Sequence, residues 1–186
     1  TEKSLGAEHI NAASMHQNIG SILQQEGRLA EAEQELLRAR EIREKALGPG
    51  HPEVATLRAN IGALLVERGQ YAAAEAELRR SLNDLEAALG AEHADLADPL
   101  LGLAELWLRT GRGAEALAPA ERAYRLVAGG QANVRAAAGF ALARALVAAG
   151  GDRARAAGLG REALAAYAAG SKERAEVDRW LARHGR

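Results

Sequence analysis

The sequence predicts an all-α fold: a right-handed α-solenoid of antiparallel helix pairs, with about four repeat units and a C-terminal capping helix. The first observation behind this prediction is an internal repeat of 42 residues, a period typical of helical solenoids. The repeated apolar row begins at Ile19, Ile61 and Leu103, and a degraded copy follows 39 residues later at Leu142. The second observation is composition. Hydrophobic residues make up 48% of the chain but aromatic residues only 3%, so Ala and Leu dominate and favour helices over strands.

Each unit is predicted to contain two helices. The first helices show apolar residues at three- and four-residue spacing and each ends at a glycine, Gly27, Gly69, Gly111 or Gly150. They are predicted at residues 9–26, 52–68, 95–110 and 132–149. The second helices carry a recurring small residue at Ala32, Ala74 and Ala116 and are predicted at residues 28–47, 70–89, 112–128 and 152–169. The result is a single array over residues 1–186, with units at about 5–47, 48–89, 90–130 and 131–170.

Short junctions separate the units. Each has a Leu-Gly pair that closes one helix and, three residues after the Gly, a His that starts the next: His9, His51 and His93. Pro52 suits a first helical turn, where no amide donor is needed. Pro99 moves the predicted start of the third unit's first helix to Asp98 as its cap, and Pro119 is expected to bend or shorten the helix that contains it.

The repeat weakens toward the C-terminus. Gly158 and Gly160 lie inside the predicted helix 152–169 and lower its helix propensity, so we expect it to be the least rigid part of the array. Ser171 then caps a last helix, residues 172–184, whose apolar residues Val177, Trp180 and Leu181 form one stripe. A helix with one apolar side suits the end of a solenoid.

Composition excludes several classes of protein. The net charge of −1 argues against a nucleic-acid or anionic-membrane binder. The chain has no cysteine, no apolar run near the ~20 residues that span a bilayer, and no signal-peptide pattern at its start. We therefore expect a cytoplasmic protein. Residues 2–6 match residues 44–48, the end of a unit, so we also expect the chain to be excised from a longer polypeptide.

The repeated row resembles the tetratricopeptide repeat. Asn18-Ile19-Gly20 and Asn60-Ile61-Gly62 are similar to that family's Asn-Leu-Gly segment, and Ala32, Ala74 and Ala116 are similar to its small-residue position. The long period and the Leu-Gly-x-x-His-Pro junction at residues 47–52 resemble the 42-residue, kinesin-light-chain-like type. The resemblance covers residues 5–127 well and 132–170 loosely, and it implies a fold that binds other proteins.

A narrower resemblance is to the C-terminal repeat regions of some bacterial serine/threonine protein kinases. It is carried by the stretches at residues 97–103, 140–146, 150–156 and 175–181. In that family the repeats follow the kinase domain, which implies a role in recruitment or regulation. The sequence has no Gly-rich nucleotide loop, no His-Arg-Asp and no Asp-Phe-Gly, so the resemblance implies the non-catalytic part.

The recurring histidines have two interpretations, metal ligands or residues at helix starts. Their spacing puts His9, His51 and His93 on successive units, at least ~8–10 Å apart. A shared ion needs each ligand nitrogen at about 2 Å, so we expect the structural role. His16 and His184 have no evident ligand partners in the sequence.

Catalytic patterns are also missing. No serine lies in a Gly-x-Ser-x-Gly turn, and the acidic pairs Glu31/Glu35 and Glu75/Glu77 lie amid Arg on the polar face of second helices. We therefore expect no enzyme, no catalytic residue, no metal and no cofactor.

The predicted binding surface is the concave groove lined by the first helices. Asn18 and Asn60 are the strongest candidates, because an amide can both donate to and accept from an extended peptide backbone. The alternative is that these amides cap or tie loops locally. Acidic residues toward the third unit favour a peptide with some Lys or Arg. The full candidate set is Ser14, Gln17, Asn18, Ser21, Gln24, Gln25, Thr56, Asn60, Ala63, Glu67, Asp98, Leu101, Glu105 and Arg109.

These observations favour a non-catalytic protein–protein interaction scaffold that binds a segment of a protein or peptide partner in this groove. The alternative is self-association into a homo-oligomer that brings attached domains together. It would use either the N-terminal unit, with the apolar side of the first helix at Ile10, Met15, Ile19 and Ile22, or the convex side of the array. A receptor for a signalling peptide ranks lower, because few aromatic residues are present to build a closed pocket.

Overall fold

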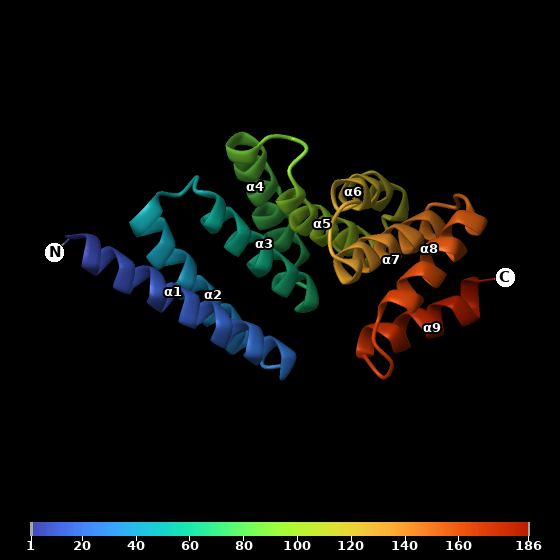
Figure 1. Ribbon diagram of the computed structural model, residues 1–186, viewed down its shortest axis with the longest axis horizontal. Coiled ribbons are helices and arrows are strands. Elements are labelled where there is room, and N and C mark those ends of the chain that lie inside the picture. Colours follow the sequence, from blue (N-terminus) through green and yellow to red (C-terminus); the bar gives the residue numbers. More distant parts are fainter. Residues whose placement is uncertain (1, 186) are drawn as a thin grey trace. The chain divides into compact units, whose positions relative to one another are not determined.

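The computed structural model describes the backbone of residues 2–185 and the side chains of residues 11–185 (Figure 1). Within this range the chain is helical and contains no strand. It divides into two compact parts, residues 1–102 and 103–186. The helices are α1 (Glu2–Gln25), α2 (Leu29–Leu47), α3 (Pro52–Glu67), α4 (Tyr71–Leu89), the 3-10 turn η1 (Ala94–Leu96), α5 (Ala97–Arg109), α6 (Gly113–Leu126), α7 (Ala132–Ala148), α8 (Arg153–Ala166) and α9 (Lys172–His184).

The N-terminal part consists of two helix pairs. Helix α1 packs along α2, α3 packs along α4, and α2 joins the pairs by packing against α3 (Figure 1). Gly48 and Gly90 end α2 and α4 with φ of 89° and 88°, a backbone region that residues with a side chain rarely adopt. The chain then turns to His51 and His93, which start the next helical elements. The junctions after α2 and α4 are therefore each a glycine stop followed by a histidine cap.

The C-terminal part stacks α6, α7, α8 and α9 in chain order. Ser171 caps α9, as predicted, by accepting a hydrogen bond from the Arg174 amide at 3.1 Å. Val177 and Trp180 of α9 are buried, and the Trp180 ring meets the Phe140 ring of α7 edge-on with centroids 5.6 Å apart. One side of α9 thus covers apolar side chains, while its other residues are mostly exposed.

Small residues bring the two helices of a pair close together. Ala32, Ala74 and Ala116 are fully buried, as their recurrence predicts. A Cβ added to Gly20 would lie 3.0 Å from Leu36 Cγ, and one added to Gly62 would lie 2.6 Å from Leu78 Cγ. The repeated glycine of the first helix therefore accommodates a leucine of the second.

Two helix starts differ from the sequence prediction. Helix α1 begins at Glu2 and runs through Leu5-Gly6, so His9 lies inside a helix, although its side chain is outside the described residues. The identical stretch Leu-Gly-Ala-Glu-His at residues 89–93 is broken at Gly90, so these local residues do not by themselves decide between a continuous and a broken helix. The third unit starts with η1 capped by His93, and Asp98 lies inside α5 instead of capping it.

Pro119 lies within α6 and does not end it, in agreement with the helix predicted at residues 112–128. Since proline lacks an amide donor, the helix loses one backbone bond there, and the flanking Ala-rich turns continue it on both sides. Gly160 lies buried in α8, where an added Cβ would meet Trp180 Cζ3 at 3.0 Å, so this glycine makes room for α9.

Candidate functional site

The predicted groove residues of the first two units lie on α1 and α3, and one direct contact joins the two helices. The Gln24 side-chain amide donates to Glu67 Oε1 at 2.6 Å. Gln24 is half-buried and Glu67 is exposed. The structure therefore brings these two candidates together at the C-terminal ends of α1 and α3.

Ser14 and Gln17 have a different role from the one expected for free groove residues. The Arg43 guanidinium of α2 donates to Gln17 Oε1 at 2.8 Å and to Ser14 Oγ at 3.2 Å. Its Nε also lies 3.2 Å from Glu53 Oε2 at the start of α3. Arg43 is only 8% exposed, so Ser14 and Gln17 accept hydrogen bonds from a nearly buried cation and orient it, while Glu53 balances its charge.

Asn18 and Asn60 remain available to a ligand. Asn18 is exposed and Asn60 is half-buried, and neither side-chain amide forms a hydrogen bond within the described part of the chain. The local capping alternative for these two amides thus finds no hydrogen bond to support it. Nearby, the Ser21 hydroxyl donates to the Gln17 carbonyl at 3.1 Å and the Thr56 hydroxyl donates to the Pro52 carbonyl at 3.0 Å. Gln25 and Ala63 are exposed.

The candidate residues on α5 were expected to make the surface acidic, but one of their two carboxylates is paired with arginines. Asp98 is exposed and Leu101 is half-buried. Partial desolvation raises the pKa of the Asp98 carboxyl, and the nearby Asp95 carboxylate raises it further. Glu105 accepts from Arg109 Nε at 2.7 Å and from Arg144 Nη1 of α7 at 2.6 Å.

Two guanidinium groups therefore compensate the Glu105 charge. Desolvation alone would raise the pKa of Glu105, but the charges and hydrogen bonds of Arg144 and Arg109 outweigh it and hold the pKa below its ordinary value. This corrects the expectation that the surface becomes acidic at Glu105: one carboxylate there faces two arginines.

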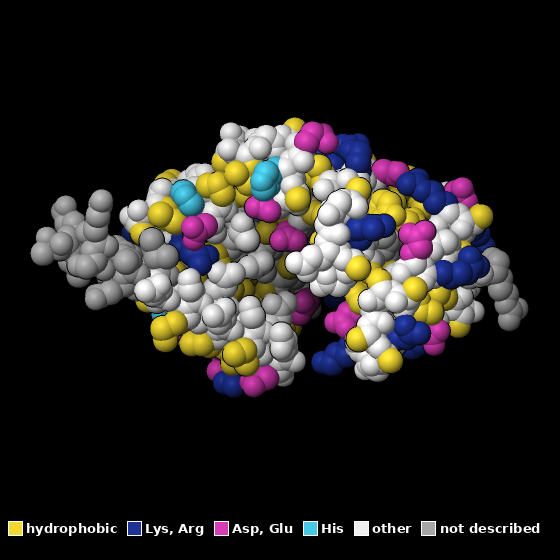
Figure 2. All heavy atoms as spheres, viewed as in Figure 1, with side chains coloured by type: hydrophobic (Ala, Val, Ile, Leu, Met, Phe, Trp, Pro, Cys, Tyr) yellow, Lys and Arg dark blue, Asp and Glu magenta, His cyan; other side chains and the backbone are white. Residues whose placement is uncertain are grey.

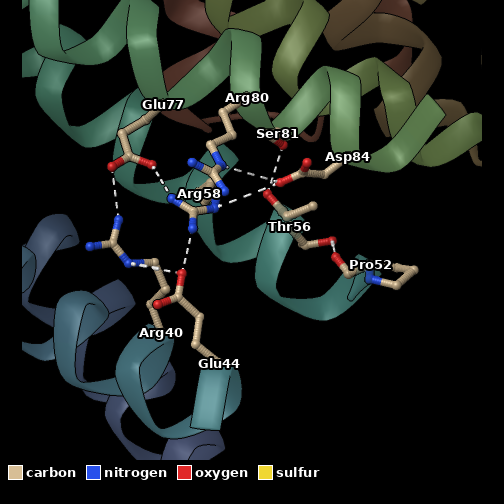
Figure 3. Close-up of polar contacts among 10 residues, drawn as sticks. Arg40, Glu44, Pro52, Thr56, Arg58, Glu77, Arg80, Ser81 and Asp84 are labelled. Carbon is tan, nitrogen blue, oxygen red and sulfur yellow. Dashed lines mark hydrogen bonds and ion pairs between the residues drawn. The ribbon is translucent and has the colours of Figure 1, made fainter. Parts of the chain in front are cut away.

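A network of three cations and three carboxylates joins α2, α3 and α4 (Figure 3). Arg58 of α3 is 8% exposed and contacts Glu44 of α2 and Glu77 of α4, the latter at 3.2 Å. Arg40 bridges the same two carboxylates, at 2.8 Å from Glu77 and 3.8 Å from Glu44. Asp84 lies 3.9 Å from Arg58 Nε and 3.7 Å from Arg80 Nε. The charges balance, which fits a structural role better than anion or cation binding.

Arg43 and Arg58 are not among the residues predicted from the sequence, although the sequence carries one signal for Arg43. Arg43 continues the apolar stripe of α2 formed by Ala32, Leu36 and Ala39, at the position where the next unit has Leu85. A charged residue on an apolar stripe indicates a buried charge that needs partners.

Two of the three recurring histidines, His51 and His93, cap helical elements, as the structural interpretation predicts, whereas His9 lies inside α1 and its side chain is outside the described residues. His51 Nδ1 accepts from the Glu53 amide and His93 Nδ1 accepts from the Asp95 amide, each at 3.2 Å. Among the described residues, no group of three or more His, Cys, Asp or Glu side chains is placed to hold a metal ion.

The described helices thus form the stacked helix pairs of a helical-repeat protein. Residues 10–87 match the tetratricopeptide repeat family. Two crystal structures of nearly identical TPR-like repeats of a putative kinesin light chain from Podosopora anserina are similar to this chain, with TM-scores of 0.73 and 0.72 at 22% and 23% identity. In both cases the match covers 95% of this chain and 86% of the other.

BtubC (BKLC) from P. vanneervenii is also similar, with a TM-score of 0.70 and 17% identity over 83% of this chain. This chain spans 62% of that protein's length. A search of curated proteins found no match. The all-α fold of TPR-like helix pairs is confirmed by these similarities, which at such identities concern the fold alone.

The described helices include no candidate for a membrane span. Of the helices that the structure describes, none combines the length and the apolar character needed to cross a bilayer.

Proposed function

We propose that this chain is a non-catalytic protein–protein interaction scaffold and that α1 and α3 bind an extended segment of a partner protein. Tetratricopeptide repeats are generally interaction modules without catalytic activity, and residues 10–87 match that family. The observation that carries the site is the pair of uncommitted amides at Asn18 and Asn60, one repeat apart on the two first helices. A side-chain amide can bind a peptide backbone through both its donor and its acceptor.

The test uses peptides selected against the wild-type chain from a random library, with affinities measured by fluorescence polarisation. Replacing both asparagines, Asn18→Ala and Asn60→Ala, should weaken the selected peptides about tenfold or more, because two hydrogen-bonding groups are lost. The melting temperature should change little, since neither amide has a partner within the described chain. Asn83→Ala, on the exposed side of α4, is the matched control. Unchanged affinity in the double variant would place the binding site elsewhere.

A more specific proposal is that this chain is the recruitment or regulatory part of a bacterial serine/threonine kinase. It rests on the sequence resemblance at residues 97–103, 140–146, 150–156 and 175–181. On this proposal the partner is a substrate or regulator of a linked kinase, and the location is cytoplasmic. Reading the gene upstream of Thr1 tests it. A kinase domain encoded there supports the proposal, and any other neighbour contradicts it.

Self-association is a second candidate function, because α1 exposes three large apolar side chains. Met15, Ile19 and Ile22 are 64%, 42% and 56% exposed, and Figure 2 shows a row of hydrophobic side chains along α1. Their counterparts one repeat later, Leu57, Ile61 and Leu64, are at most 1% exposed. The apolar row is therefore buried in the second unit and exposed to solvent in the first. Ile10 belongs to the predicted row but lies outside the described side chains.

Sedimentation velocity over a hundredfold range of concentration tests this alternative. Wild type should shift from monomer toward dimer as concentration rises, and the variant Ile19→Gln with Ile22→Gln should remain monomeric. Leu37→Gln is the control, because Leu37 is an exposed apolar residue on α2 instead of α1. A wild-type chain that is monomeric throughout would remove self-association as a function.

A further inference from the structure

The apolar row on the first helix of each unit is buried in all units but the first. In the later units each member of the row is at most 3% exposed. These members are Leu57, Ile61 and Leu64 on α3, Leu103 and Leu106 on α5, and Leu142 and Ala145 on α7. On α1 the equivalent side chains, Met15, Ile19 and Ile22, are exposed to solvent. The surface of α1 is therefore built like surfaces that another helix covers.

The second unit shows which kind of helix covers such a row. Helix α3 packs along its own second helix, as α1 does, but α3 also packs against the preceding helix α2. The chain passes from α2 to α3 through the short turn at residues 48–51. Two helices joined by so short a connection run in opposite directions. The neighbour that α3 has and α1 lacks is therefore an antiparallel helix.

The chain itself offers one matching apolar surface. Among the described residues, five large hydrophobic side chains are exposed, and three of them are Met15, Ile19 and Ile22 on α1. The other two, Leu37 on α2 and Val134 on α7, lie singly on other helices. The row of α1 can therefore be covered by the row of α1 in a second copy.

The surface around the row is uncharged. Residues 11–25 contain no Lys, Arg, Asp or Glu. His16 is directed to α2, where its Nδ1 lies 2.6 Å from Glu35 Oε2. Asn11, Asn18 and Gln25, which are exposed, carry neutral amides. Contact between two such helices buries no unpaired charge, and depletion of charged residues is typical of the centre of a protein interface.

We propose that two copies of this chain pack α1 against α1 in antiparallel orientation, about a two-fold axis between Met15 and Ile19. In this register Met15 lies against Ile19 of the partner subunit, and Ile22 lies against the small Ala12 of the partner subunit. A large side chain thus faces a small one at each end of the row, which favours close packing.

This inference rests on the self-association proposed above and adds the partner helix, its direction and its register. Three large side chains from each copy form a contact smaller than a standard stable interface, which has about 20–30 residues a side. The dimer is therefore weak and reversible.

Salt separates this contact from a head-to-tail one. Residues 1–102 carry 17 Asp and Glu against 10 Lys and Arg, a net charge of −7, whereas residues 103–186 carry 8 against 14, a net charge of +6. Contact of α1 with α1 brings two negative parts together, so added NaCl should tighten the dimer severalfold by screening their repulsion. A contact between residues 1–102 of one copy and 103–186 of another would weaken with added NaCl instead, which would overturn the proposal.

Disulfide formation tests the direction and the register, because the chain has no cysteine of its own. Chains with Met15→Cys are mixed with size-tagged chains with Ile19→Cys, and oxidised glutathione is added as the oxidant. The proposed register brings these two positions together, whereas it offsets each position from its own copy by about 6 Å along the helix. The mixed disulfide should therefore form about tenfold faster than either self disulfide.

Leu37→Cys is the matched control, because Leu37 is an exposed apolar residue on α2 and should form disulfides slowly with both chains. Self disulfides of Met15→Cys and Ile19→Cys that form faster than the mixed one would show parallel helices. Slow disulfides at both α1 positions, in a wild-type chain that sediments as a dimer, would place the contact elsewhere. Either result overturns this proposal and leaves self-association standing, whereas a wild-type chain that is monomeric at every concentration overturns both.

Discussion

Residue size is matched across the helix pairs. In the first two units a glycine on the first helix meets a leucine on the second, Gly20 with Leu36 and Gly62 with Leu78. The counterparts in the third unit, Ala104 and Ala120, are both fully buried. A smaller residue on one helix thus accompanies a larger one on the other, so that each pair keeps a similar separation.

Gly62→Ala should destabilise the N-terminal part by about 1–3 kcal/mol, because its methyl would overlap Leu78 Cγ at 2.6 Å. In a Leu78→Ala background, which itself costs about 2–5 kcal/mol, the same methyl should cost much less, since the overlap is gone. Urea denaturation followed by circular dichroism measures both. Gly50→Ala, where an added Cβ meets no atom within 4 Å, is the control. Additive effects of the two substitutions would contradict size matching.

His51→Ala should cost about 0.5–2 kcal/mol of stability, because the amide of Glu53 loses its acceptor, His51 Nδ1. His51→Asn should keep most of the stability, since Asn is a strong helix cap. Thermal and urea unfolding measure the two variants. Gln131→Ala is the control, because Gln131 precedes α7 without a side-chain cap bond. A His51→Ala variant no less stable than His51→Asn would rule out a capping role.

Position within a repeat could be predicted from the sequence, but side-chain partners could not. The buried glycines and alanines follow from recurrence, and the caps follow from His at a helix start. Arg43 shows the limit. Its place on an apolar stripe predicts burial, yet its choice of Ser14 and Gln17 depends on the separation and rotation of α1 and α2. For this reason the candidates Ser14 and Gln17 prove to be committed to Arg43, whereas Asn18 and Asn60 remain candidates.

At the scale of helices, equivalent positions in successive units hold side chains of different polarity. Arg58 connects α3 to both neighbouring helices through Glu44 and Glu77, whereas the equivalent His16 has one partner, Glu35. In the third unit Leu100 and Pro119 replace this polar pair. The backbone arrangement therefore tolerates either ionic or apolar contacts at one place, and the period alone does not distinguish them.

Helix bounds were predicted to within a few residues where a glycine or a cap marks an end. The predicted starts are wrong for α1, which begins at Glu2, and for α5, which follows η1. Both errors lie at junctions where the local residues permit more than one conformation and packing decides.

The ion pairs between α5 and α7 predict a pH effect on stability. Since the folded-state pKa of Glu105 is lowered, its carboxylate stabilises the fold above the unfolded-state pKa of about 4.3. This contribution is lost as the pH falls through the folded-state pKa. Glu105→Gln should therefore be less stable than wild type at pH 7, and the difference should shrink between about pH 5 and pH 3.

Urea midpoints followed by tryptophan fluorescence at several pH values measure this difference. Asp178→Asn, at an exposed residue of α9, controls for the general loss of one negative charge. A stability difference between Glu105→Gln and wild type that does not depend on pH would contradict the ion-pair explanation.

For the whole molecule, the division into residues 1–102 and 103–186 bears on how it unfolds. In repeat proteins stability is approximately a sum of local terms, because each unit contacts only its neighbours. A change deep in one part should therefore lower the stability of that part first. The two tryptophans, Trp107 and Trp180, both belong to residues 103–186, so their fluorescence reports on that part while circular dichroism reports on both.

Arg58→Ala provides the test of this independence. It removes charged hydrogen bonds to Glu44 and Glu77, which keep Arg40 as a partner, and should cost about 1.5–3 kcal/mol. In urea, part of the circular dichroism signal should be lost at a lower concentration than in wild type, while the tryptophan transition should stay in place. Arg38→Ala, which removes an exposed ion pair with Glu35, should shift neither signal by more than about 0.5 kcal/mol. If the tryptophan transition of Arg58→Ala moves together with the circular dichroism, the two parts unfold as one cooperative unit, and the Arg58 network stabilises the whole chain.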